Sequence, residues 1–155
     1  MVPHLVEFMA DWLSRNLTEV FQLPEPASDW LLSLFNVIQV FDDVADGDAV
    51  ARCDLDRALY DALAGWYSNP FFATHAGSLV PLLAVNILKW QASDRVEREG
   101  NAGPVSFSWR GGYYDVVLMV VQLCHGRQFA TENAHHVLAL YGESFDDYLA
   151  EFNHA

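Results

Sequence analysis

The chain has 155 residues, a length that suits one domain with its own hydrophobic core. Hydrophobic residues make up 52% and aromatic residues 14%, which excludes a disordered or low-complexity protein. Asp and Glu number 21 against 8 Lys and Arg, so the formal charge is -13. This balance excludes the broad cationic surface that ordinary nucleic-acid binding requires, and it favours cations or a basic protein as partners.

The cysteines, the N-terminal segment and the apolar runs indicate the cellular compartment of the protein. Cys53 and Cys124 have neither the spacing of a disulfide framework nor that of a metal or redox motif, so we expect two buried free thiols. The N-terminal segment carries acids and lacks the early basic residues of a signal peptide. The apolar runs near 79–88 and 116–124 are shorter than the ~18 residues that a bilayer span needs. The sequence therefore predicts a cytoplasmic protein with no membrane span.

Apolar residues recur at helical spacing along nearly the whole chain. The pattern predicts an amphipathic helix over residues 5–13, followed by a break at two prolines. A second helix is expected from a cap at Ser28 or Asp29 to about Val44, and Gly47 is its stop signal.

The middle of the chain holds further start and stop signals. Asp54 is the expected cap of a third helix, and the Asn69-Pro70 pair predicts the start of a short fourth helix. Because Pro81 is tolerated best near a helix beginning, a fifth helix is expected to start afresh at Gly77-Ser78 and run towards Glu97.

In the last third of the chain, the pattern predicts a loop at residues 100–104 and helices after it. A sixth helix is expected over 108–124, although the valines of this segment also suit a strand. Thr131 is the expected cap of a helix to about Tyr141, and further helical turns follow over 143–152. Residues 1–155 are therefore expected to form a single all-α domain, a bundle of about six to seven helices.

Three acids close the second predicted helix. Asp42 and Asp46 lie one turn apart on the same face, with Asp43 adjacent to them. Like charges at this spacing destabilise a helix by about 0.2 to 0.5 kcal/mol per pair, and acids near its C-terminus oppose the macrodipole. A bound cation would relieve this repulsion, and Mg²⁺ needs only one or two protein carboxylates. A solvated turn with no metal is the competing interpretation, since chance alone produces such spacing roughly one time in ten.

The segment from Trp30 through the acids at 42–46 resembles the first aspartate-rich motif of class I isoprenoid synthases, most closely that of the squalene and phytoene synthase branch. The segment 48–63 resembles the helix that follows in that branch, and 69–73 resembles the start of the next one. The similarity covers about a third of the chain, which has about half the usual length of the family.

This resemblance implies an isoprenoid-synthase-like bundle and a Mg²⁺-dependent diphosphate site. Asp42 and Asp46 would be metal ligands, with Asp43 a ligand or a partner of one, and the metal would neutralise charge on a departing diphosphate. An aromatic cavity would hold the prenyl chain. The residues able to line it are Trp30, Phe35, Phe71, Phe72, Trp90, Tyr113 and Tyr114. Most rings of this kind are simply part of an ordinary core.

The family also needs a second acidic motif. Glu143, Asp147 and Glu151 recur at four-residue intervals and form the best candidate, so Glu143 and Asp147 are kept as possible metal ligands. Their residue types do not match the family, and an acidic C-terminal stripe is more often a solvated face. A homodimer would help a chain of this length to rebuild a cavity.

Three functions therefore stay open. The first is a Mg²⁺ site with a diphosphate ligand, with catalysis uncertain. The second is a non-enzymatic acidic helical protein, viral or accessory, that binds a basic partner through its surface. The third is an all-α nucleotide pyrophosphohydrolase, which requires paired acids on two facing helices.

Overall fold

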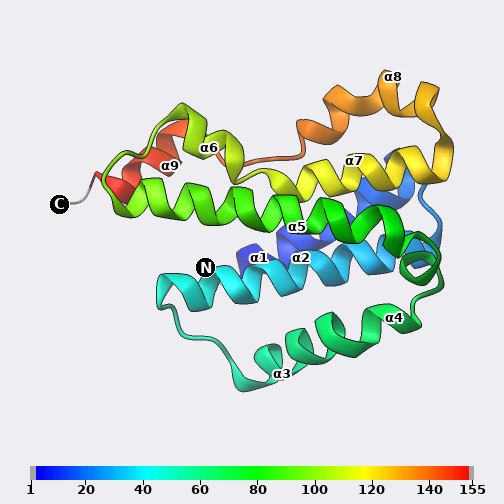
Figure 1. The fold of residues 1–155 in the computed structure, drawn as a ribbon, viewed down its shortest axis with the longest axis horizontal. Helices are drawn as coiled ribbons and strands as arrows, with labels where there is room; N and C mark the ends of the chain where they lie inside the picture. The colour runs from blue at the N-terminus through cyan, green and yellow to red at the C-terminus, as the bar shows by residue number, and fades with distance from the viewer. Residues whose placement is uncertain (1–2, 154–155) are drawn as a thin grey trace. The chain divides into compact units, whose positions relative to one another are not determined.

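The computed structural model describes the backbone of residues 3–153 and the side chains of residues 7–153. The described chain is helical along most of its length and has no strand, which confirms the all-α prediction. It divides into two compact units, Met1–Ala76 and Gly77–Ala155, and helix α5 continues from the first into the second (Figure 1). The expectation of one domain stays a prediction.

The first unit is built around α2. Its core consists of apolar side chains from α1, α2 and the segment between them, among them Leu17, Trp30 and Leu31, each at most 1% exposed. The elements in chain order are α1 (Pro3–Arg15), the π-helical turn η1 (Asn16–Val20), α2 (Glu25–Asp46), α3 (Arg52–Tyr60), the π-helical turn η2 (Asp61–Gly65), α4 (Trp66–Ser68) and the start of α5 (Pro70–Arg98).

Helix α2 ends as expected and begins earlier than expected. Gly47 has a φ of 78°, the left-handed conformation that glycine adopts without strain, and its N–H closes the last turn on Asp43 and Val44. The start is at Glu25, so the prediction of a cap at Ser28 or Asp29 is wrong. The physical reason is Pro26, whose fixed φ and missing N–H suit the first turn of a helix.

The predicted cap of α3 is wrong, and the predicted start of α5 is confirmed. Helix α3 begins at Arg52 after Ala51, so Asp54 lies in the first turn and is not the cap. Helix α5 begins at Pro70 as predicted. The Asn69 side chain accepts hydrogen bonds from the N–H groups of Phe71 and Phe72, at 2.9 and 3.0 Å.

The predicted restart at Gly77-Ser78 is wrong, because α5 runs through Pro81 without a break. Proline inside a helix removes one N–H donor and crowds the carbonyl four residues earlier, which here belongs to Gly77. Both Gly77 and Pro81 are exposed, so water can solvate the carbonyl that loses its partner.

Helix α5 is also long and apolar enough to cross a membrane, judged by length and composition. An 18-residue window of α5 has a mean hydropathy of 1.6, and 11% of it is buried. The absence of a membrane span stays a prediction.

The second unit contains the rest of α5 and four further helices, α6 (Pro104–Trp109), α7 (Gly112–His125), α8 (Arg127–Leu138) and α9 (Phe145–Phe152). The expected helix over 108–124 is divided at Arg110 and Gly111 into α6 and α7. Gly112 allows α7 to approach α5 closely, since a Cβ there would lie 2.5 Å from the Asn86 side-chain oxygen.

The valine-rich segment is helical, as its spacing predicted. Val116, Val117, Val120 and Val121 on α7 are at most 1% exposed, and α7 packs along α8. Helix α8 begins at Arg127, so Thr131 is not its cap; the Thr131 hydroxyl donates back to the Arg127 carbonyl. Helix α9 is capped by the Ser144 hydroxyl, which accepts from the Asp147 N–H at 3.1 Å.

Both cysteines are free, and the expectation that both are buried is wrong. Cys53 on α3 is exposed, and Cys124 on α7 is half-buried. Partial burial raises the pKa of the Cys124 thiol.

Replacing Asn69 should destabilise the first unit. The side chain caps α5 and also donates to the Pro26 carbonyl at 2.9 Å, so it ties the start of α5 to the start of α2. We expect Asn69→Ala to lower the free energy of unfolding by about 1 to 2 kcal/mol, measured by urea denaturation followed by circular dichroism. Asn101→Ala, at an exposed loop position, is the control; equal losses in the two variants would contradict the capping role.

Candidate functional site

The acids at the end of α2 differ in their surroundings. Asp42 and Asp43 are half-buried, and Asp46 is exposed at the last residue of the helix. Asp43 is among the side chains that line a pocket of about 480 Å³ in the first unit, whereas Asp42 and Asp46 are not. The structure therefore directs one of the three predicted acids towards a concave surface.

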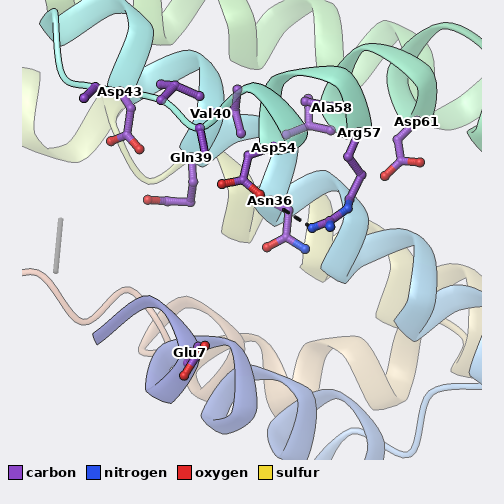
Figure 2. Close-up of a pocket in the computed structure, with 13 residues that line it drawn as sticks. Glu7, Asn36, Gln39, Val40, Asp43, Asp54, Arg57, Ala58 and Asp61 are labelled. Atoms are coloured by element: carbon purple, nitrogen blue, oxygen red, sulfur yellow. Dashed lines mark ion pairs between the residues drawn. The ribbon is translucent and has the colours of Figure 1, made fainter. Parts of the chain in front are cut away.

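The pocket lies between α2 and α3, with Glu7 of α1 at its edge (Figure 2). Helix α2 contributes Asn36, Gln39 and Asp43, whose numbers follow the helical spacing of three and then four residues. The floor is apolar: Val37, Val40 and Ala58 form a buried cluster beneath the polar side chains.

The facing wall repeats the same spacing. Asp54, Arg57 and Asp61 follow one another at three and four residues along α3 and into η2. The Arg57 guanidinium lies 3.7 Å from the Asp54 carboxylate. Carboxylates outnumber cations among the lining residues, so the pocket has a negative potential that attracts positive ligands.

A chain of hydrogen bonds leads from the pocket into the core of the first unit. The Ser33 hydroxyl donates to the Asp61 carboxylate at 3.1 Å, and the Trp66 indole N–H donates to the same hydroxyl at 2.8 Å. Trp66 packs against Trp30 and Phe72, with ring centroids 5.9 Å from each. These bonds hold the Asp61 carboxylate in one orientation at the pocket wall.

The aromatic side chains expected around a prenyl cavity are mostly packed in the core. Trp30 and Phe72 stack with centroids 5.2 Å apart, and both are at most 2% exposed. Tyr113 and Tyr114 are buried on α7. None of the described side chains that line the pocket between α2 and α3 is aromatic.

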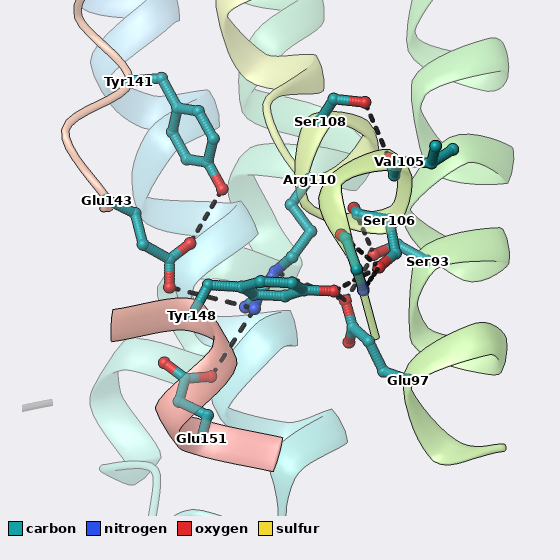
Figure 3. Close-up of polar contacts among 11 residues, drawn as sticks. Ser93, Glu97, Val105, Ser106, Ser108, Arg110, Tyr141, Glu143, Tyr148 and Glu151 are labelled. Atoms are coloured by element: carbon teal, nitrogen blue, oxygen red, sulfur yellow. Dashed lines mark hydrogen bonds and ion pairs between the residues drawn. The ribbon is translucent and has the colours of Figure 1, made fainter. Parts of the chain in front are cut away.

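Two of the C-terminal acids, Glu143 and Glu151, belong to a cluster in the second unit that surrounds Arg110 (Figure 3). The Arg110 side chain is 17% exposed, and its nitrogens lie 4.0 Å from Glu97, 4.0 Å from Glu143 and 3.6 Å from Glu151. The guanidinium also lies 5.2 Å from the centre of the Tyr148 ring, a cation–π contact. Glu143 therefore has a protein cation as partner, while Asp147 is exposed in the first turn of α9.

Hydrogen bonds connect this cluster to three helices. The Tyr148 hydroxyl donates to Glu97 of α5 at 3.0 Å and lies 2.6 Å from the Ser106 hydroxyl of α6. Tyr141 donates to Glu143 at 2.8 Å. Desolvation, followed by the bond to Glu143, raises the pKa of Tyr141. These contacts join α9 to α5 and α6.

The basic residues that could hold a diphosphate are mostly engaged by acids. Lys89 bonds to Asp115 at 2.8 Å. Three ion pairs join neighbouring turns along the chain. Arg52–Asp56 lies on α3, and Arg95–Glu99 and Arg98–Asp94 lie at the end of α5. Among the described residues that line the pocket, Arg57 is the basic one.

Sequence reasoning missed most of the pocket. It chose the α2 acids by their density, and it named Asp54 only as a helix cap and omitted Asn36, Gln39 and Asp61. The signal was present as two polar rows with three- and four-residue spacing in helices expected to pack together. What the sequence lacked was the rotation of α3 about its axis, which decides which row faces α2.

The comparisons with known proteins do not identify a family for this chain. The sequence matches no family model and no curated protein, and no solved structure matches the chain. Any function must therefore be argued from the geometry.

Removing the central cation of the second unit should destabilise it. Arg110→Met leaves Glu97, which is 10% exposed, and Glu143 without the guanidinium that lies 4.0 Å from each of them. We expect a loss of about 3 kcal/mol in the free energy of unfolding, measured by urea denaturation. Arg127→Met, at an exposed position of α8, should change stability little, and adding Glu97→Gln to Arg110→Met should recover part of the loss. Equal stability of Arg110→Met and wild type would contradict this assignment.

Buried tyrosines should make the fold sensitive to alkaline pH. Desolvation raises the pKa of Tyr114 from 10.0 to about 12. The folded protein holds this proton more tightly than the unfolded chain does. The resulting stabilisation is complete below pH 10 and is lost as the pH rises from 10.0 to about 12.

The measurement is the free energy of unfolding across this pH range. Tyr114→Phe should flatten the decline, whereas Tyr60→Phe, at a side chain that is 67% exposed, should not. A decline as steep in Tyr114→Phe as in wild type would show that Tyr114 does not contribute.

Proposed function

We propose that the protein binds a divalent cation, Mg²⁺, in the pocket between α2 and α3, and that the cation carries a diphosphate-type ligand. One observation carries the proposal: Asp43 from α2 and Asp54 and Asp61 from the facing segment line the same pocket. Carboxylate and amide oxygens are the ligands that Mg²⁺ prefers, and Asn36 and Gln39 add amide oxygens to the lining.

The donor set fits a partly hydrated ion. Within residues 7–153, no three His, Cys, Asp or Glu side chains converge in an arrangement that could hold a metal ion. Mg²⁺ does not require such a cage, since one or two carboxylates suffice and water and phosphate oxygens complete its octahedron. The hydrogen bond from Ser33 orients Asp61, which reduces the cost of ordering a ligand.

The size and charge of the pocket support a ligand larger than the ion alone. A volume of about 480 Å³ lies in the range of small-molecule sites. A diphosphate would meet the bound Mg²⁺ on one side and Arg57 on the other, and Mg²⁺ would supply the charge that makes an acidic pocket acceptable to an anion. Binding, rather than turnover, is the activity proposed.

A relationship to isoprenoid synthases belongs to the proposal and rests on the sequence motif. The aromatic side chains that a prenyl chain requires do not line this pocket, which favours a relative that keeps the cation site without the reaction. Asp42 and Asp46 would act as neighbours of the ion, while Glu143 and Asp147 lie in the second unit, where Glu143 has Arg110 as its partner. A cytoplasmic location is part of the same proposal.

Replacing two pocket carboxylates should weaken Mg²⁺ binding. We expect Asp43→Asn with Asp54→Asn to weaken the affinity at least about tenfold, a loss of about 1.4 kcal/mol or more, measured by titration calorimetry with magnesium chloride. Asp11→Asn with Asp29→Asn removes the same charge from exposed positions of the first unit and should bind as wild type does. Asp42→Asn with Asp46→Asn measures the share of the other α2 acids. The site would be rejected if the titration stayed unchanged both in Asp43→Asn with Asp54→Asn and in Asp42→Asn with Asp46→Asn.

The acidic surface supports a second candidate function. A formal charge of -13 suits a protein that binds a basic partner through long-range attraction. Binding of a basic protein that weakens steeply with salt, and that needs no Mg²⁺, would favour this function over the first.

A further inference from the structure

Asp61 lies at the end of the pocket that is far from the connection between α2 and α3. Figure 2 shows Asp43 and Asp61 at opposite ends of the lining, with Asp54 and Arg57 between them. Residues 47–51 join the two helices, so Asp43 and Asp54 both lie close to this connection along the chain. Asp43 and Asp54 therefore suit the ion at one end of the pocket, and Asp61 is left to meet another part of the ligand.

The hydrogen bonds behind Asp61 run in one direction. An indole N–H only donates, so Trp66 gives its proton to the Ser33 oxygen at 2.8 Å. The single hydroxyl proton of Ser33 then points to one oxygen of the Asp61 carboxylate, 3.1 Å away. Trp66 is held in turn against the buried rings of Trp30 and Phe72. This relay therefore fixes the carboxylate and occupies one of its oxygens.

The second oxygen of Asp61 is available to a ligand. Among residues 7–153, the hydrogen bond from Ser33 is the one made to this carboxylate. A carboxylate accepts hydrogen bonds and does not donate them. A ligand group that meets this oxygen must therefore bring a donor, such as a hydroxyl. A prenyl chain has no donor, and a further phosphate would be repelled by the like charge.

We propose that the diphosphate-type ligand is the ester of a sugar, and that Asp61 binds hydroxyl groups of that sugar. This inference rests on the proposed Mg²⁺ and diphosphate site. Arg57 lies four residues before Asp61, about 6 Å along the helix axis. A pentose spans a comparable length between its 5′-phosphate and its 2′ and 3′ hydroxyls, so a phosphate at Arg57 places these hydroxyls at Asp61. Dinucleotide-binding proteins use an acidic side chain on the ribose in the same way.

The lining from α2 also suits a sugar. Asn36 and Gln39 contribute amide groups, which both donate and accept hydrogen bonds. The apolar floor of Val37, Val40 and Ala58 offers a surface to the carbon atoms of the ring. None of the described lining side chains is an aromatic ring of the kind that surrounds a prenyl chain. The pocket therefore matches a hydrophilic diphosphate ester better than an isoprenoid one.

Titration calorimetry of the full chain with ADP and with 2′,3′-dideoxy-ADP, both in excess magnesium chloride, tests the hydroxyl contact. Wild type should bind ADP at least about tenfold more tightly, because the dideoxy form leaves Asp61 without its donor. Asp61→Ala should bring this ratio close to one, and the ratio cancels any effect of the variant on the ion. Asp56→Ala, at an exposed position of α3 outside the pocket, is the matched control and should keep the wild-type ratio.

The relay is tested by its own variants. Ser33→Ala removes the donor to Asp61 and should lower the ratio at least about threefold, whereas Ser33→Thr keeps a hydroxyl and should restore it. Ser68→Ala, at an exposed serine of the same unit, is the control. Binding should also change the fluorescence of Trp66, more with ADP than with dideoxy-ADP, and Trp66→Phe should remove this difference.

Ribose 5-diphosphate distinguishes the two sources of the sugar. Affinity equal to that of ADP would assign the ligand to sugar diphosphates, and weaker affinity would assign it to nucleotides; both results support the contact with Asp61.

Three outcomes would overturn the proposal. They are equal affinity of wild type for ADP and dideoxy-ADP, a wild-type ratio in Asp61→Ala, and tighter binding of geranyl diphosphate than of ADP. In each of these cases Mg²⁺-dependent binding of pyrophosphate would leave the proposed function standing. A wild-type chain that does not bind pyrophosphate with Mg²⁺ would reject the proposed function and this inference together.

Discussion

The rotation of α3 about its own axis is the constraint on which the first unit depends. Its polar row faces α2, and only the small side chain of Ala58 enters the apolar cluster with Val37 and Val40. This rotation has two consequences. It builds an acidic pocket beside α2, and it leaves the leucines of the same helix exposed. A pocket rich in carboxylates costs stability, and a cation inside it would offset part of that cost.

The two units treat their acids differently. In the second unit, Glu97, Glu143 and Glu151 surround the guanidinium of Arg110, which is 17% exposed and lies against the Tyr148 ring. That arrangement supplies the positive charge from the protein itself. In the pocket of the first unit the cation is Arg57, whose side chain is 65% exposed and therefore screened by water. The comparison explains why the pocket, rather than the C-terminal acids, is the stronger candidate for an external cation.

The long helix α5 shows how local signals can be outweighed. Asn69 and Pro70 mark its start because a side-chain cap and a proline in the first turn act within a few residues. Pro81 suggested a restart by the same local logic. The helix continues because neither Gly77 nor Pro81 has to pack against anything, so the cost of the lost hydrogen bond is limited to a solvated carbonyl. The starts of α2 and α8 were misplaced for a related reason, since several residues in each segment are acceptable first-turn residues.

The sequence by itself determined the helical class, the end of α2 at Gly47, the start of α5 and the helical state of the valine-rich segment. Periodicity, capping and glycine conformation act over a few residues, so one sequence carries them in full. The tertiary structure alone decided that Asp43 lines one pocket with Asp54 and Asp61 and that Glu143 lies beside Arg110. Those encounters depend on how each helix is rotated against its neighbour, and that rotation is set by the packing of many side chains together rather than by any local pattern.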